Sequence, residues 1–249
     1  MVRYSITLIT LLTIGFGQSN VPDKLFLEGN QAMTEEDYRA AADKYEEILA
    51  QGYTHKNLFY NLGNAYYRLG YNGLAIWAYE KGLQLDPQDG DLKYNLAIAN
   101  AQVRDRIEAP DMVFILEWYR LIKSLFSIQQ WIFIGLGLAA TGGIIFNINR
   151  FTSNSGFGKN LVFIMLILSA VCHSIALSRY WDNTEYSEAV IVDTEVFAYS
   201  APFERSDIML FKIHEGIKVE IVQSQDDWTE IILLDGKQGW IRSDTIRGI

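Results

Sequence analysis

The residues best suited to covalent chemistry are Cys172 and His173, which are adjacent in the chain. Neighbouring residues on a helix point about 100° apart, and this segment is apolar, so a nucleophile–base pair in water is not expected. A histidine inside an apolar segment is either functional or a hydrogen-bonding residue between packed helices. His55 and His214 have no second ligand at a metal-binding interval.

Other signatures of enzymes are also missing from the sequence. A single cysteine excludes an intramolecular disulfide and a thiolate metal cluster. The chain has no phosphate-binding loop, no dinucleotide fingerprint and no nucleophile elbow. We therefore expect no catalytic residue, no metal and no cofactor, and the chain is not predicted to be an enzyme.

A 34-residue repeat provides elements that could position side chains for binding instead. Gly29-Asn30 recurs as Gly63-Asn64, 34 residues later. Three further pairs share the interval: Ala41 and Ala75, Tyr45 and Tyr79, Leu49 and Leu83. This order of small, aromatic and aliphatic residues resembles the tetratricopeptide repeat, a helix–turn–helix unit. The resemblance implies an all-α solenoid over residues 22–108, with units 22–54 and 55–88 and a closing helix over 90–106.

The same resemblance implies a protein-binding groove. The positions that line the groove in the family are here Phe26, Asn30, Tyr60, Asn61, Asn64, Tyr67, Tyr94 and Asn95. Asparagine amides can hydrogen-bond a peptide backbone in both senses, and tyrosines supply amphipathic contact area. The alternative is that the asparagines only brace neighbouring helices. Some family members hold a carboxylate with basic residues, but Phe26, Asp91 and Asn95 occupy those places, so no base is expected in the groove.

Three apolar segments divide the chain. Residues 1–17 have a basic Arg3, an apolar stretch and small residues at Gly15 and Gly17, which predicts a secretory signal peptide; an uncleaved membrane helix is the alternative. Residues 129–149 and 160–180 are long enough to span a bilayer and contain no charge until Arg179. Core helices of a soluble domain would be the alternative for these two.

The connector between the predicted spans fixes an expected orientation. Residues 150–159 contain Arg150 and Lys159 and no acid, so the positive-inside rule predicts that they lie in the cytoplasm. Both flanking domains then lie on the outer side. Residues 111–128 carry apolar side chains at helical spacing, which predicts an amphipathic interfacial helix. Packing of that helix against the repeats would give the same pattern.

From residue 186 to 249 the pattern changes to short β-branched runs. Residues 217–221 alternate with period two, and Asp235-Gly236 is a hairpin signal after a second strand. Five short strands suggest a small barrel. The stretch Leu210–Gly216, Trp228 and the stretch Asp235–Ile241 resemble the bacterial SH3-like domain. Relatives of this barrel often bind cell-wall peptides, so Trp228 and Trp240 could line a ligand groove; core positions are the alternative.

Charge limits the class of partner. Residues 18–110 carry 14 acids against 9 bases and residues 182–249 carry 14 against 6. A phosphate backbone requires a basic surface, so nucleic acid is not expected as a partner. The partners that remain compatible with this charge are proteins, the lipid bilayer and peptidoglycan.

The order of segments carries a further resemblance. A multidomain membrane protein with a tetratricopeptide solenoid, a two-helix transmembrane hairpin and a C-terminal all-β SH3-like barrel is similar to the E-type proteins of the Bacteroides aerotolerance operon. That resemblance implies a multi-pass bacterial inner-membrane protein with periplasmic domains that acts in oxidative-stress tolerance. It implies companions that are membrane proteins with von Willebrand A domains and a MoxR-type ATPase system.

Overall fold

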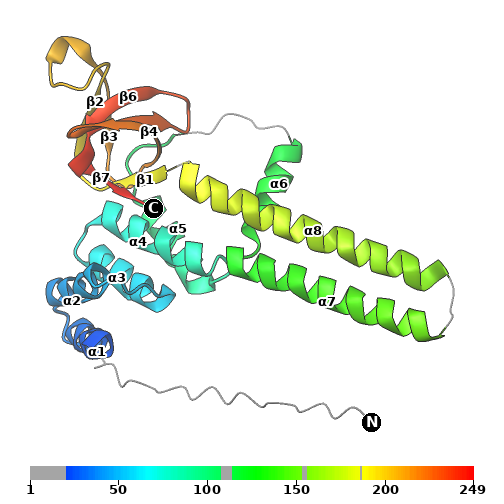
Figure 1. Cartoon of the computed structure of the whole chain (residues 1–249). Coiled ribbons are helices and arrows are strands. Elements are labelled where there is room, and N and C mark those ends of the chain that lie inside the picture. Colours follow the sequence, from blue (N-terminus) through cyan, green and yellow to red (C-terminus); the bar gives the residue numbers. More distant parts are fainter. Residues whose placement is uncertain (1–20, 108–113, 153–155, 186) are drawn as a thin grey trace.

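The computed structural model describes residues 21–107, 114–152, 156–185 and 187–249. It shows a helical repeat domain (residues 21–107), two long antiparallel helices and a β domain (residues 187–249) that lies against the repeat domain (Figure 1). These parts confirm the predicted fold class. The signal peptide predicted for residues 1–17 lies outside the described residues.

The repeat domain consists of two helix pairs and a closing helix. Its helices are α1 (Val21–Thr34), α2 (Tyr38–Ala50), α3 (Lys56–Arg68), α4 (Asn72–Leu85) and α5 (Gly90–Ala101). The closing helix was predicted to reach residue 106, but it ends at Ala101. It ends early because the following residues leave the helix direction to reach the β domain, where Val103 packs against the hydrophobic cores of both domains.

Two glycines permit the close approach of the paired helices. A Cβ atom on Gly29 would lie 2.5 Å from Cε1 of Tyr45, and one on Gly63 would lie 2.4 Å from Cε1 of Tyr79. Both tyrosines are almost completely buried. The repeated glycine therefore makes room for the repeated tyrosine ring, which is the physical basis of the 34-residue pattern.

The β domain is one antiparallel sheet. It has seven strands, two more than expected, in the order β3-β2-β6-β5-β4-β1-β7. Their bounds are β1 (Ser187–Ile191), β2 (Glu195–Tyr199), β3 (Met209–His214), β4 (Lys218–Gln225), β5 (Trp228–Leu233), β6 (Gln238–Arg242) and β7 (Ile246–Gly248), with short 3-10 turns at Ser206–Ile208 and Ser243–Thr245. The predicted hairpin is confirmed between β5 and β6, where Gly236 takes a positive φ of 87°.

The two long helices form the hairpin expected of the spans. They are α7 (Ile128–Thr152) and α8 (Gly156–Glu185), and both are long and apolar enough to cross a membrane. Only 17% and 22% of the residues in their most apolar stretches are buried, unlike the core helices of a soluble domain. The connector between the spans is shorter than the predicted range of residues 150–159, because α7 continues to Thr152 and α8 begins at Gly156.

One close contact joins the two spans. Ser169 Oγ donates to the carbonyl of Gly135 at 2.8 Å, and a Cβ on Gly135 would lie 2.4 Å from the ring of His173. His173 Nδ1 lies 2.8 Å from the carbonyl of Ser169 on its own helix. Ser169 therefore makes a hydrogen bond between the spans, and His173 packs against Gly135.

The β domain docks on the outer side of the second repeat. Gly73 at the start of α4 lies so close that a Cβ there would be 2.5 Å from the carbonyl of Ile191 in β1. The Glu215 carboxylate accepts a hydrogen bond of 2.8 Å from the Gly73 backbone N–H, and Trp77 Nε1 donates to the carbonyl of Gly248 at 2.7 Å. The two domains therefore share α4 as a common element.

The close approach at Gly63 makes a stability prediction. Gly63→Ala is expected to lower the thermal unfolding midpoint of the full chain, because the new methyl group would overlap the Tyr79 ring and overpacking costs about 1–3 kcal/mol. Circular dichroism in detergent measures the midpoint. Gly90→Ala is the control, since a Cβ there meets nothing within 4 Å. Equal midpoints for the two variants would contradict the close-packing explanation.

Candidate functional site

Asparagine side chains link the inner helices of the repeat domain in two equivalent clusters. Asn30 Oδ1 accepts hydrogen bonds from Tyr45 OH at 2.7 Å and from Asn61 Nδ2 at 2.8 Å. One repeat later, Asn64 Oδ1 accepts from Tyr79 OH at 2.9 Å and from Asn95 Nδ2 at 2.8 Å. Each cluster joins three helices through one shared acceptor.

These clusters hold buried hydroxyl groups in place. Burial raises the pKa of Tyr45 to about 12, and burial likewise raises the pKa of Tyr79. Both hydroxyls therefore remain protonated donors. The asparagine oxygens brace neighbouring helices, which is the alternative that the sequence left open for them.

The other predicted groove residues differ in their exposure. Phe26 is half-buried and packs on the Tyr45 ring at 5.8 Å between centroids. Tyr60 is also half-buried and packs against the repeat core. Tyr94 is 69% exposed, and Tyr67 accepts a hydrogen bond from Gln102 Nε2. The eight residues thus follow the inner side of α1, α3 and α5 and differ in how much of each side chain is exposed.

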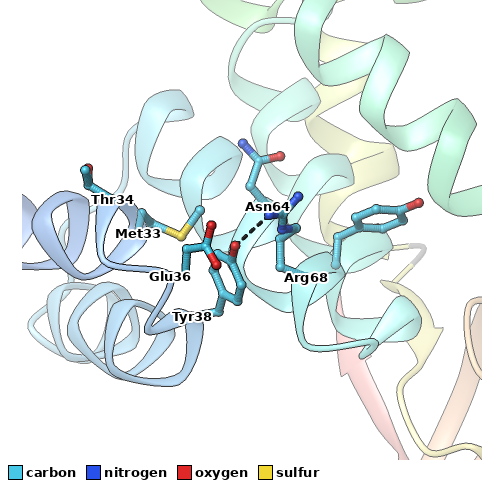
Figure 2. Close-up of a pocket in the computed structure, with 7 residues that line it drawn as sticks. Met33, Thr34, Glu36, Tyr38, Asn64 and Arg68 are labelled. Carbon is cyan, nitrogen blue, oxygen red and sulfur yellow. Dashed lines mark hydrogen bonds between the residues drawn. The ribbon is translucent and has the colours of Figure 1, made fainter.

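An open hollow lies at one end of this inner side (Figure 2). Its volume is about 410 Å³, and it lies between the end of α1, the start of α2 and the second half of α3. The residues that line it are Met33, Thr34, Glu36, Tyr38, Asn64, Tyr67 and Arg68. We call this feature the groove hollow. It presents apolar and aromatic surface with one acid and one base.

Arg68 corrects the expectation of a groove without a base. Its guanidinium donates to Tyr38 OH at 2.6 Å and stacks 4.9 Å from the centre of that ring (Figure 2). Arg39 and Tyr71 make a second pair of this kind, with a hydrogen bond of 2.5 Å. These pairs join residues 30 and 32 positions apart. The groove positions known from the repeat family did not include these pairs. The spacing of a basic and an aromatic residue by nearly one repeat length could have predicted them.

Trp228 and Trp240 offer little surface to a ligand. They are 8% and 9% exposed. The Trp228 ring meets Tyr199 edge-on at 5.7 Å, and Arg242 lies 5.7 Å from its centre on another side. The exposed apolar side chains of this domain lie elsewhere, and the largest of them include Phe203, Met209 and Leu210.

The histidines outside the spans have structural partners. His55 Nδ1 accepts from the backbone N–H of Asn57 at the start of α3. His214 Nδ1 lies 2.9 Å from Asp105 Oδ1, and its Nε2 lies 3.1 Å from Arg104. Within the described residues, no group of three or more histidine, cysteine or acidic side chains is arranged to hold a metal ion.

A half-buried charge cluster fastens the β domain to the repeats. Arg247 makes a two-pronged ion pair with Glu46, with both N–O distances at 2.7 Å, and stacks 3.5 Å above the Trp77 ring. Tyr66 OH donates to the same carboxylate at 2.5 Å. Burial alone would raise the pKa of Glu46, but the hydrogen bonds from Arg247 and Tyr66 and the charge of Arg247 hold that pKa below its ordinary value.

Comparison with known proteins identifies one domain. Residues 192–248 match the family model of the bacterial SH3 domain. This agrees with the sequence motifs of the β domain. A similar solved structure is the tetratricopeptide-repeat domain of Sgt2 from Aspergillus fumigatus, with 18% identity over 66% of this chain and 82% of that one and a TM-score of 0.30. A likeness this distant supports no argument, so the repeat assignment rests on the helix pairs themselves. No curated protein matches the chain.

The Glu46 cluster predicts a pH-dependent stability. The pKa of Glu46 is lower in the folded than in the unfolded chain, so the ionised carboxylate stabilises the fold. Its contribution to the free energy of unfolding is complete above the unfolded-state pKa of ~4.3 and is lost as the pH falls toward the pKa of the folded state. Glu46→Gln is expected to lower stability near neutral pH by on the order of 1–2 kcal/mol and to flatten the acid side of the profile. Unfolding midpoints across pH measure both effects, with the exposed neighbour Glu47→Gln as control. Parallel acid profiles for the wild type and Glu46→Gln would contradict the assignment.

Proposed function

We propose that this chain is a membrane-anchored, non-enzymatic adaptor whose groove hollow holds a segment of a partner protein. The observation that carries the proposal is the unequal use of the two sides of the repeat domain. The β domain covers the outer side along α4, whereas the groove hollow on the inner side stays open. A solenoid whose outer face is already occupied retains its inner face for another protein.

The composition of the groove hollow indicates what it could bind. Met33, Tyr38 and Tyr67 supply contact area for apolar side chains, while Glu36 and Arg68 add one charge of each sign. The surrounding repeat domain is acidic, with 14 acids against 9 bases over residues 18–110. These features favour a mixed or basic peptide segment over a free carboxylate.

The other parts of the chain support a proposal for its cellular location and its physiological role. The hairpin of α7 and α8 and the basic connector support a multi-pass inner-membrane protein with both domains in the periplasm. A bacterial SH3 domain is consistent with the cell envelope. The resemblance to the aerotolerance operon extends the proposal to oxidative-stress tolerance, with von Willebrand A membrane proteins and a MoxR-type ATPase system as companions.

Site-specific photocrosslinking in native membranes tests the groove. Benzoylphenylalanine at Thr34, which is exposed and lines the groove hollow, is expected to capture a membrane protein with a von Willebrand A domain, identified by mass spectrometry. The same probe at Asp43, exposed elsewhere on α2, is expected to capture none.

The Arg68→Ala variant sharpens this experiment. It should reduce the Thr34 adduct several-fold, because Arg68 lines the groove hollow and is exposed. Arg39→Ala is the matched control, since Arg39 stacks on Tyr71 in the same manner but does not line the groove hollow. Asn64 is unsuitable as a binding variant because its loss would also release Tyr79 and Asn95. Equal loss in both arginine variants would overturn the groove proposal.

A second candidate function is peptidoglycan binding by the β domain, which the bacterial SH3 match favours. In that case the full chain in detergent should sediment with purified peptidoglycan. Changing Phe203 and Leu210 to serine should abolish sedimentation, because these residues are about half exposed (47% and 53%). Leu27→Ser, at an exposed position on α1, is the control. A chain that stays in solution with peptidoglycan removes this candidate.

A further inference from the structure

Helix α6 (Phe114–Ser124), which precedes the spans, has an exposed apolar face. Leu121, Ile122 and Leu125 lie three, four and seven residues after Trp118, and Leu125 is in the turn that directly follows the helix. The four side chains are 53% (Trp118), 58% (Leu121), 38% (Ile122) and 40% (Leu125) exposed. On a helix these positions form one stripe about 100° wide. Exposed apolar surface of this kind is typical of sites that contact another protein or a membrane.

The other side of α6 is fastened to the end of α8. Tyr119 OH and Lys123 Nζ each donate to Ser178 Oγ at 2.9 Å. Arg179 NH1 donates to the carbonyls of Lys123 and Phe126, both at 2.7 Å. These four hydrogen bonds hold the polar side of α6 and the turn after it against the end of α8, so the apolar stripe faces away from α8.

These hydrogen bonds with Ser178 and Arg179 fix the position of α6 along the length of the hairpin. Ser178 lies three residues before the end of the apolar stretch Gly158–Trp181, and the other apolar stretch begins at Ile128. Trp131 Nε1 donates to the Lys123 carbonyl at 3.3 Å, which joins the start of α7 to the same corner. Tyr180 and Trp181, both 55% exposed, lie at this level too. Aromatic rings of this type favour the boundary between hydrocarbon and headgroups.

We infer that α6 lies in the outer interfacial layer of the membrane with Trp118, Leu121, Ile122 and Leu125 buried in lipid. The inference goes beyond the adaptor function and needs that α7 and α8 span the bilayer with their connector on the cytoplasmic side. It selects lipid over the repeat domain as the partner of the apolar stripe, because the side-chain hydrogen bonds of Tyr119 and Lys123 are made with α8. The repeat domain meets this corner through Gln88, whose Nε2 donates to the Leu125 carbonyl at 2.7 Å, just after α6 ends at Ser124.

Depth-dependent quenching in proteoliposomes tests this placement. The chain has one cysteine, so single-cysteine variants are made in a Cys172→Ser background and labelled with a nitrobenzoxadiazole probe. The matched pair is Ile122→Cys and Ser124→Cys, two residues apart and so on opposite sides of α6. Vesicles of phosphatidylcholine and phosphatidylglycerol carry bromines either near the headgroups or deep in the acyl chains. Leu136→Cys, 52% exposed on α7, reports whether the span is in lipid.

We expect shallow bromines to quench the fluorescence of the probe at position 122 several-fold more than that of the probe at position 124. Deep bromines should quench the probes at both positions weakly. An interfacial helix buries its apolar face by roughly 5–10 Å, which places Ile122 within reach of the shallow bromines only. Deep quenching at Leu136 together with no quenching at Ile122 by either shallow or deep bromines would overturn the inference while leaving the spans intact. Deep quenching at both Ile122 and Ser124 would also overturn it, because α6 would then be inserted. Loss of quenching at Leu136 would instead contradict the membrane anchor on which the adaptor proposal relies.

Discussion

Helix α4 is buried at every residue from Ala75 to Tyr79, and the arrangement of both domains follows from this. Its residues Ala75, Ala78 and Tyr79 are buried within the repeats, while Gly73 and Trp77 meet the β domain. A helix with five consecutive apolar residues carries apolar surface on more than one side, and each of these sides needs a cover. The repeats supply one cover and the strands β1 and β7 supply the other. Neither domain alone would bury α4, so the two stabilise each other.

The membrane hairpin joins these two domains without separating them. The chain leaves the repeat domain after α5, passes through α6, α7 and α8, and returns directly into β1 beside α4 (Figure 1). The Arg179 contacts and the Gln88 contact close the corner at which the chain enters the spans. The domains are consequently held close to the end of the hairpin, and a partner approaching them would meet a surface of fixed orientation.

The two domains are not arranged as two independent binding modules. The SH3-like motif around Leu210–Gly216 places Glu215 and Gly216 against the repeat domain, where Glu215 accepts from the first turn of α4. These motif residues therefore act in docking. The inner side of the repeats, with its asparagine clusters and the groove hollow, is the side that remains for recognition. Glu36 and Arg68 give that hollow charges of both signs.

Local patterns were sufficient to define the parts of this protein. The 34-residue interval, the two uncharged apolar runs and the Asp235-Gly236 hairpin each reflect contacts within one element or between neighbours in the chain, so periodicity reveals them. The assembly of the parts could not be read in this way. Glu46 meets Arg247 across 201 positions and Arg68 meets Tyr38 across 30. The run of six consecutive apolar residues from Leu74 to Tyr79 fits a second buried face on α4, but that face was not predicted from the sequence. Which surface would cover that face was decided by the folded chain, because complementary shape and charge exist only once both domains have formed.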